Sequence, residues 1–291
     1  MIPAFVNPLA GNADESCDAL ASVGIGVFDV HRSPPIELAA RIRLAVERGA
    51  RRIVVAGGDG SIGTAAGALA GTDVELAILP GGTLNHLAKD LAIPLDLDEA
   101  ARLAVAGRSI PVDAGSMNGR LFVNTSSVGA YVRFVRDRER LERRLGYHVA
   151  SLVAGTRLLL RMPTVHIALN VAGVERRYVT PLVFVGVGER ELKLPTLGAR
   201  IPGGQPGLHV MVVRERSGGR TLALGLAAAA RGVDAVSRTP ALDSFLVNSF
   251  RIERRVKTAA VDGEIRRVDS PLEYRYLAGH LRIVVPRQKG V

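Results

Sequence analysis

Residues 52–63 read RIVVAGGDGSIG, an apolar run followed by a glycine-rich turn and the start of a helical pattern. The run Arg52–Ala56 predicts a buried strand, and a helix is expected from about Ser61 to Leu69. The glycines let the backbone turn sharply and approach a ligand with no Cβ in the way. Strand, turn and helix in this order indicate an α/β sheet with a ligand site at the carboxyl end of a strand.

The composition of this turn suggests a phosphate ligand. The first amides of a helix attract an anion such as phosphate, and Ser61 could cap the same helix. Asp59 would repel phosphate unless it binds Mg²⁺ or takes a proton from an attacking hydroxyl. The alternative is a plain strand-to-helix turn in which Asp59 is only a turn residue.

Two further turns occupy equivalent places. The segment Pro80-Gly81-Gly82-Thr83-Leu84-Asn85 follows an expected strand at 75–79, and Asn7-Pro8-Leu9-Ala10-Gly11 follows one at 2–6. The carboxyl ends of parallel strands meet at one edge of a sheet, so the three turns should face one crevice. Thr83 either contacts phosphate there or caps the next helix. The common nucleotide fingerprints, the Walker loop and GxGxxG with a distal acid, are absent.

The elements between these turns alternate between strand and helix patterns. Residues 23–30 predict a strand, and residues 35–48 predict a helix that ends at Gly49. We therefore interpret residues 1–118 as a doubly wound α/β domain.

Short strands dominate the second part of the sequence, residues 119–280. We expect them at 121–128, 165–171, 179–187, 208–213, 249–256 and 272–276. Helical stretches at about 130–160 and 219–237 interrupt them. This pattern is typical of a mostly antiparallel β-sandwich or barrel.

The composition of the 291 residues fits about two globular domains and excludes disordered and fibrous proteins, with 47% hydrophobic and 23% charged residues. A single cysteine, Cys17, rules out an intramolecular disulfide and a cysteine-based zinc site. No apolar run reaches the roughly 20 residues of a spanning helix, and the first residues lack the pattern of a signal peptide. We therefore expect a cytoplasmic protein.

The net charge of +10 favours anionic partners, whether nucleic acid, anionic lipid or phosphorylated small molecules. Aromatic residues make up only 4% and tryptophan is absent, which disfavours single-stranded nucleic acid, and no motif supports nucleic-acid binding. Residues 133–144 contain six arginines and three acids. This stretch either rests on an anionic membrane surface or forms a solvated helix face with internal ion pairs.

Taken together, NPLAG at 7–11, GGDGS at 57–61 and PGGTLNHLAKDLAIP at 80–94 resemble the diacylglycerol kinase catalytic-domain family. The resemblance continues through Asp113, Gly115, Phe122, Asn124 and Gly129 to Val261-Asp262-Gly263-Glu264, and so covers nearly the whole sequence. It implies an N-terminal domain similar to phosphofructokinases and NAD kinases, and a C-terminal β-sandwich for the lipid substrate. It also implies that residues 281–291 return to the first domain.

The resemblance implies binding of ATP and Mg²⁺ between the two domains. The residues it assigns to the nucleotide are Asn7, Ser33, Gly57, Gly58, Asp59, Gly60, Ser61, Ile62, Gly63, Gly82 and Thr83.

The same matching assigns roles to three acids. Glu264 is the general base, and Asp262 binds the Mg²⁺ of the nucleotide. Asp59 then helps with the metal or the hydroxyl, although related sphingosine kinases give the base role to its position. The alternative for residues 262–264 is a surface turn between two strands.

The sequence also departs from the family pattern. Gly63 and Thr64 replace the usual Asn-Glu pair after the glycine-rich loop, which could loosen nucleotide contacts. Bacterial members usually carry an Asp-Asp-Gly segment that holds a structural Mg²⁺, and the matching residues here are Gln205-Pro206-Gly207. Neither Gln205 nor Pro206 supplies a carboxylate, so we expect this structural metal site to be weak or absent.

These features predict an ATP- and Mg²⁺-dependent lipid kinase that phosphorylates the hydroxyl of a diacylglycerol-like or sphingoid lipid. It would visit an anionic membrane surface to collect its substrate. Two alternatives stay open, a soluble kinase of the NAD-kinase type and a nucleotide-binding regulator without transfer activity. The sequence leaves the identity of the lipid and a homo-oligomeric state open.

Overall fold

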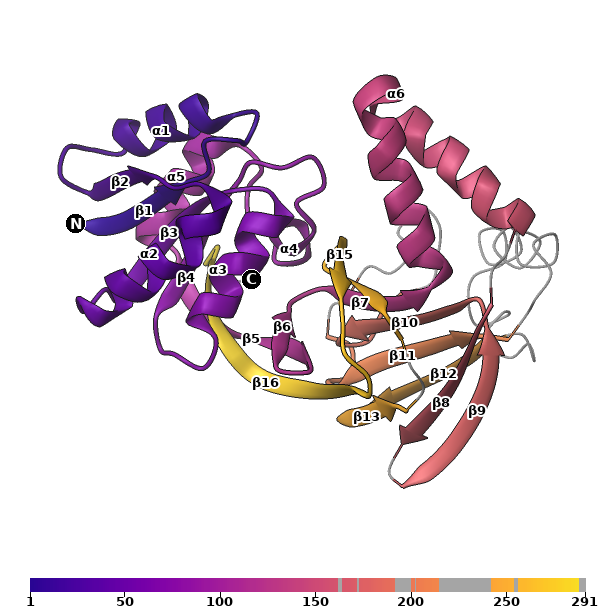
Figure 1. Cartoon of the computed structure of the whole chain (residues 1–291). Coiled ribbons are helices and arrows are strands. Elements are labelled where there is room, and N and C mark those ends of the chain that lie inside the picture. The colour runs from indigo at the N-terminus through magenta and orange to yellow at the C-terminus, as the bar shows by residue number, and fades with distance from the viewer. Residues whose placement is uncertain are drawn as a thin grey trace. The chain divides into compact units, whose positions relative to one another are not determined.

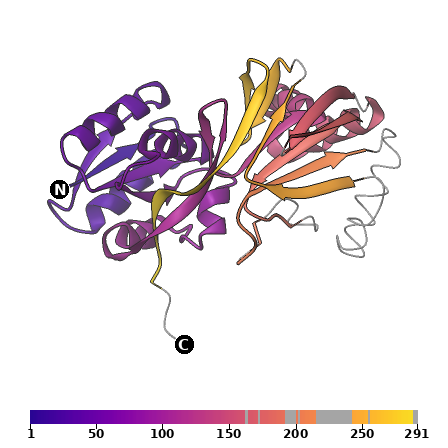
Figure 2. The same cartoon turned by 90° about the horizontal axis from the view of Figure 1, so that it is seen from below.

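The structure is a computed structural model that describes residues 1–161, 164–171, 173–191, 200–201, 203–214, 242–253 and 256–287. It divides into two compact units. Unit 1 contains Met1–Ala114, Arg120–Asn124 and Leu277–Val291, and unit 2 contains Gly115–Gly119 and Thr125–Tyr276. The division therefore differs in detail from the expected boundaries at 118 and 281. The reason is that strands β5 (Arg108–Met117) and β16 (Leu272–Val285) each contribute residues to both units (Figure 2).

Unit 1 alternates strands and helices along the chain. Its first elements are β1 (Ile2–Val6), α1 (Ala13–Ser22), β2 (Phe28–Arg32), α2 (Pro35–Glu47), β3 (Arg52–Gly57), α3 (Asp59–Leu69), β4 (Glu75–Pro80), α4 (His86–Asp90) and α5 (Leu97–Ala106). The short strand β6 (Arg120–Phe122) pairs with β5. The parallel strands lie in the order β2-β1-β3-β4-β16, in which β16 pairs with β4 through Arg282 and Ile283. Through this pairing the last strand of the chain joins the sheet of unit 1.

Helices cover both faces of this sheet, as expected for a doubly wound fold (Figure 1). Alternate strand residues supply the two cores: Val55 and Ile78 pack on the face of α2 and α3, whereas Val54 and Leu79 pack on the face of α1 and α5. Side chains of a strand point alternately to opposite faces, so strands buried on both sides read as continuous apolar runs.

Two predicted elements of unit 1 are corrected. The strand expected at 23–30 begins only at Phe28, because Gly24 and Gly26 adopt positive φ angles of 148° and 77° and form a turn. Helix α3 begins at Asp59, two residues before the expected start. Ser61 therefore lies inside the first turn and is not the cap.

Unit 2 is built from antiparallel strands, in agreement with the predicted class. Its elements are β7 (Thr125–Gly129), α6 (Ala130–Arg161), β8 (Val165–Val171), β9 (Val174–Thr180), β10 (Leu182–Val187), β11 (Leu208–Val213), β12 (Leu242–Val247), β13 (Ser249–Ile252), β14 (Thr258–Val261) and β15 (Glu264–Arg267). One sheet has the order β12-β11-β10-β7-β14-β15, and the other continues from β16 through β13 and β8 to β9. The runs expected as single strands at 121–128 and 179–187 are each two strands.

Helix α6 is bent at Gly146, whose φ of 71° and ψ of 165° interrupt the helical backbone. The second predicted helix, at 219–237, lies outside the described residues. Within the described part of the chain, none of the helices combines the length and apolar character needed to span a membrane.

Candidate active site

Two glycine-rich loops of unit 1 touch each other at the carboxyl ends of β3 and β4. A Cβ placed on Gly82 would lie 2.6 Å from the Cα of Gly58, and one on Gly81 would lie 3.1 Å from the Cα of Gly57. The Gly81 amide donates a hydrogen bond of 2.9 Å to the Gly57 carbonyl. Only glycine permits this backbone-to-backbone contact, so the two predicted turns do meet at one edge of the sheet.

The third turn joins this pair through Asn7, at the end of β1. Its Nδ2 donates to Ser61 Oγ at 3.0 Å, and its Oδ1 accepts the Leu9 amide at 3.0 Å. A Cβ on Gly57 would lie 2.7 Å from Ser61 Oγ, so this glycine makes room for the bond. Asn7, Gly57 and Ser61 are thus brought together at one point.

The carboxylate of Asp59 reaches across to the second loop. Its Oδ1 accepts the backbone amide of His86 at 2.8 Å, at the start of α4. Asn85, at φ 49°, exchanges two further hydrogen bonds with the backbone of Gly82, at 2.9 and 2.7 Å. Asp59 therefore links the two loops through one of its carboxylate oxygens.

Several polar groups at this edge of the sheet have no partner among the described residues. The amides of Asp59 and Gly60 open helix α3 and have no acceptor within it. Ser33, at 0% exposure, follows β2 at the same edge of the sheet, and its hydroxyl is buried without a hydrogen-bond partner among the described residues. The Oδ1 atom of Asn12 is also buried and, within the same part of the chain, unpaired. A buried polar group without a hydrogen bond lowers the stability of the fold unless a ligand or a water molecule bonds to it.

Three side chains near these loops lie in different surroundings, and only one of them, Ile62, is a predicted nucleotide residue that is buried in the core. Ile62 is only 4% exposed and packs in the core between the sheet and α2 and α3. Thr83 is exposed, and α4 begins three residues later, so Thr83 is not its cap. The hydroxyl of Thr64 donates to the Gly60 carbonyl of its own helix at 2.9 Å.

In unit 2, Asp262 and Gly263 form the two-residue turn between β14 and β15. Their φ angles of 46° and 83° are both positive, which is the pattern of a tight hairpin turn and suits Asp-Gly. Asp262 also exchanges two hydrogen bonds with Thr125, its Oδ1 accepting the amide at 3.0 Å and its amide donating to the carbonyl at 2.8 Å. The surface-turn alternative thus explains the backbone of this segment.

Glu264 opens β15 directly after this turn. Its carboxylate is half exposed and forms an ion pair with Arg266, two residues along on the same face of the strand. The ion pair holds the carboxylate beside the hairpin tip. Its assigned role as general base stays a prediction.

The segment around Gln205 carries no carboxylate of its own. The Gln205 amide donates to Oε2 of Glu189 at 2.9 Å, and the Glu189 amide donates back to the Gln205 carbonyl at 3.2 Å. Glu189 therefore closes this loop. Among the described residues, no group of three or more His, Cys, Asp or Glu side chains could hold a metal ion.

Sequence reasoning misses Asn12, Asn85 and the backbone of His86. Asn85 carries the clearest signal, since asparagine tolerates the left-handed conformation and lies three residues after the Gly81-Gly82 pair. The side chain of His86 is exposed. Its contribution comes from the main chain, which no side-chain pattern reveals.

Comparisons with known proteins relate the loops of unit 1 to a known family. The family described as "Diacylglycerol kinase catalytic domain" matches residues 2–117. A relative from Cronobacter sakazakii named "Probable lipid kinase YegS-like" is 39% identical over 124 residues, 40% of each chain. A protein named "Diacylglycerol kinase" from Mycobacterium tuberculosis strain H37Rv is 29% identical over 172 residues, 54% of this chain and 56% of that one. The chain thus matches about half the length of these curated relatives.

Solved structures show that the similarity in fold extends over nearly the whole chain. A Bacillus anthracis str. Sterne protein covers 98% of this chain and 96% of its own, with a TM-score of 0.74 at 22% identity. A diacylglycerol kinase from the same strain gives a TM-score of 0.68 at 19% identity over the same shares. The two-part architecture is therefore that of these proteins. Residues 2–117 match the family of the diacylglycerol kinase catalytic domain.

Proposed function

We propose that the protein is a lipid kinase that transfers the γ-phosphate of ATP to the hydroxyl of a diacylglycerol-like or sphingoid lipid. The observation that carries this proposal is the contact between the two glycine-rich loops, with the open amides of α3 beside it. Backbone that approaches without Cβ atoms, at the start of a helix, suits a polyphosphate. The family of residues 2–117 gives the class of reaction.

The residues present fit a nucleotide. A Cβ at Gly57, Gly58 or Gly82 would crowd the loops, and the buried Ser33 hydroxyl lacks a partner among the described residues. ATP supplies the phosphoryl group when bound, and Mg²⁺ on its phosphates neutralises their charge. Magnesium commonly needs only one or two protein carboxylates beside the phosphates, so a three-ligand protein site is not required.

Each residue of this chain has a distinct task in the proposal. The open amides at Asp59 and Gly60 bind phosphate oxygens, and Asp59 holds the second loop through His86. We assign Glu264 as the base that takes the proton from the lipid hydroxyl, and Asp262 as a ligand for the metal. Phosphoryl transfer depends mainly on positioning and charge neutralisation, which these groups supply.

We also propose that helix α6 rests on an anionic membrane surface. Arg136, Arg140 and Arg144 are exposed and four residues apart, so they lie along one side of the helix. Leu145 and Val149 nearby are 44% and 50% exposed. Cationic and apolar side chains together suit the interface of a bilayer. The alternative of internal ion pairs has an example in Arg138 with Glu142 at 3.7 Å.

The test is transfer of labelled γ-phosphate from ATP onto lipids in mixed micelles with Mg²⁺. The panel contains diacylglycerol, monoacylglycerol, sphingosine and ceramide. Parallel reactions contain NAD in place of the lipid, or a chelator in place of Mg²⁺. Label on one lipid that depends on Mg²⁺ supports the proposal. Binding of ATP without label on any lipid contradicts it and favours the nucleotide-binding regulator, and label on a soluble acceptor such as NAD favours a kinase of the NAD-kinase type.

A further inference from the structure

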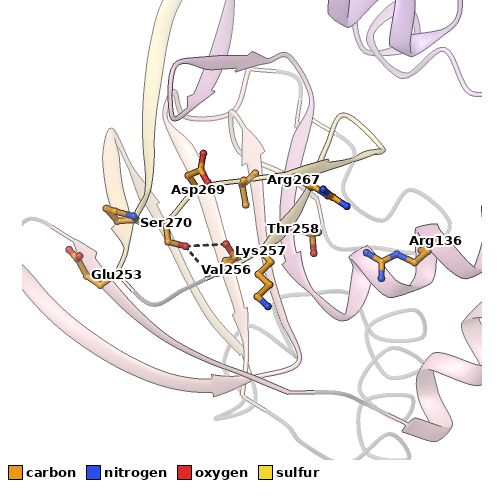
Figure 3. Close-up of a pocket in the computed structure, with 10 residues that line it drawn as sticks. Arg136, Glu253, Val256, Lys257, Thr258, Arg267, Asp269 and Ser270 are labelled. Carbon is orange, nitrogen blue, oxygen red and sulfur yellow. Dashed lines mark hydrogen bonds between the residues drawn. The ribbon is translucent and has the colours of Figure 1, made fainter.

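Unit 2 contains a cavity of about 840 Å³ that the chemistry above does not use (Figure 3). It lies beside the base of the β14–β15 hairpin and the first turns of α6. Its charged lining residues are Arg136, Glu253, Lys257, Arg267 and Asp269. The volume is within the usual range for small-molecule sites.

Among the described residues, the three cations of this cavity have no side-chain partner. None of Arg136, Lys257 and Arg267 forms an ion pair or side-chain hydrogen bond with any residue in the described part of the chain. Arginines close by behave differently, since Arg251 pairs with Glu273 and Arg266 pairs with Glu264. Two carboxylates, Glu253 and Asp269, also line the cavity, so its lining keeps one excess positive charge. An anion between the three cations would offset their mutual repulsion.

The cations gather at one side of the cavity. Figure 3 shows Arg136, Lys257 and Arg267 around Thr258, with Glu253 at the far side. Thr258 and Arg267 are direct partners across the hairpin. Glu253 is itself 3.8 Å from Arg251, which offsets part of its charge.

The backbone that carries these cations is held in place. Ser270 Oγ accepts the Val256 amide at 2.7 Å and donates to the Val256 carbonyl at 3.1 Å. The Val268 amide donates to the Lys257 carbonyl at 3.2 Å. The two sides of the hairpin base are therefore tied together before any ligand arrives.

This cavity is separate from the carboxylate assigned to catalysis. Side chains alternate along β15, so Glu264 and Arg266 share one face and Arg267 points to the other. A ligand held by Arg267 thus lies on the face of the hairpin opposite Glu264.

We propose that the cavity binds a phosphate group through Arg136, Lys257 and Arg267, as a second anion site of this protein. Two guanidinium groups offer paired donors that match phosphate oxygens, and the ammonium group adds a third charge. A tetrahedral dianion can meet donors from three directions, whereas a carboxylate offers two oxygens in one plane. The phosphate belongs either to a lipid headgroup or to a free ion.

The experiment is calorimetric titration of the full chain, without nucleotide, with inorganic phosphate and with monomeric dihexanoyl phosphatidic acid. The variant is Lys257→Gln with Arg267→Gln. The control is Arg177→Gln with Arg275→Gln, which removes the same charge from exposed strand positions of unit 2 that face carboxylates. We expect wild type and control to bind alike and the variant to bind at least about tenfold more weakly. Arg136→Gln, on a different element, should weaken the same binding, and melting curves verify that each variant is folded.

The outcomes are distinct. Binding of inorganic phosphate that the variant loses supports the site with a free ion as its ligand, and binding of phosphatidic acid alone supports it with a lipid headgroup. The proposal is overturned if the variant binds as tightly as the control, or if wild type binds neither probe saturably. None of these results depends on kinase activity.

Discussion

Glycine and aspartate occur together in both units, but for different physical reasons. In the loops of unit 1 the glycines are needed for space: Gly58 has an ordinary φ of −82°, yet a Cβ on it would lie 3.2 Å from the Cα of Gly82. In the hairpin of unit 2, Gly263 has φ 83° and nothing within 4 Å of an added Cβ. One glycine permits a close approach, and the other permits a turn.

This difference separates a loop that is suited to binding a ligand from a structural turn. Close contact between two backbones places open amides at one point, which is useful for binding phosphate. A positive φ in a two-residue hairpin only reverses the chain. Any function of the hairpin must come from the side chains beside the turn, above all Glu264.

Gly82→Ala should have the largest effect on stability and on ATP binding. Its Cβ would lie 2.6 Å from Gly58 Cα and 3.0 Å from Asn85 Oδ1, so the loops must separate. We expect a loss of about 1–3 kcal/mol in the free energy of unfolding and loss of ATP binding. Calorimetry and thermal melts measure both. Normal ATP binding by this variant would contradict the role of the loop contact.

Asp59 can be tested by two substitutions that differ in one property. Asp59→Ala removes the acceptor for the His86 amide and should cost about 1 kcal/mol of stability, together with ATP affinity and transfer. Asp59→Asn keeps an acceptor oxygen, so stability and ATP binding should recover. Transfer should stay low because the amide lacks the negative charge that would help with the metal or the hydroxyl. Melting curves, ATP titrations and transfer assays measure the three effects. Full transfer by the asparagine variant would mean that Asp59 only positions the loop.

Gly263→Ala tests the other side of the comparison. The added Cβ meets open space, so the cost is limited to the left-handed backbone, about 1–2 kcal/mol. We expect a lower melting temperature for unit 2 with unchanged ATP affinity. A fall in ATP affinity as large as that of Gly82→Ala would erase the distinction between the two turns.

The stability of unit 2 should depend on pH through His209, and this effect should be smaller than those of the substitutions above. Burial lowers the pKa of His209, whose Nδ1 accepts the Arg190 amide at 2.9 Å and whose Nε2 lies 2.7 Å from Ser244 Oγ. The folded state thus binds the proton less readily than the unfolded chain, so stability falls as the pH drops below about 6.5. Melting curves between about pH 5 and pH 8 should show a weaker dependence for His209→Gln than for wild type. An equal dependence would rule out His209 as the source, and His166→Gln is the matched control.

Much of the fold follows from the sequence because apolar runs and glycine turns set it locally. The strands at 52–57 and 75–80 and the doubly wound order can be predicted from pattern alone. The breaks at 123–124 and at Pro181 cannot, because a two-strand corner leaves the apolar pattern nearly continuous. The expected start of α3 is wrong because Gly58 and not a polar side chain stands at its cap.

The candidate site is predictable where side chains carry the chemistry. The Asn7–Ser61 bond and the meeting of the loops agree with the motif positions. The bond from the His86 amide to Asp59 is not predictable, since it joins a main-chain group to a residue 27 positions away. Ile62 points into the core, because a motif match does not say which way a helical side chain points.

The central claim is tested most directly by transfer of labelled phosphate from ATP to the lipid that the panel selects, with three proteins side by side. They are wild type, Glu264→Gln and Glu175→Gln, the last of which alters a glutamate that is also paired with an arginine two residues along its strand. The account predicts equal rates for wild type and Glu175→Gln and a rate at least about a hundredfold lower for Glu264→Gln. Equal rates for all three, or no labelled lipid with wild type, would contradict it.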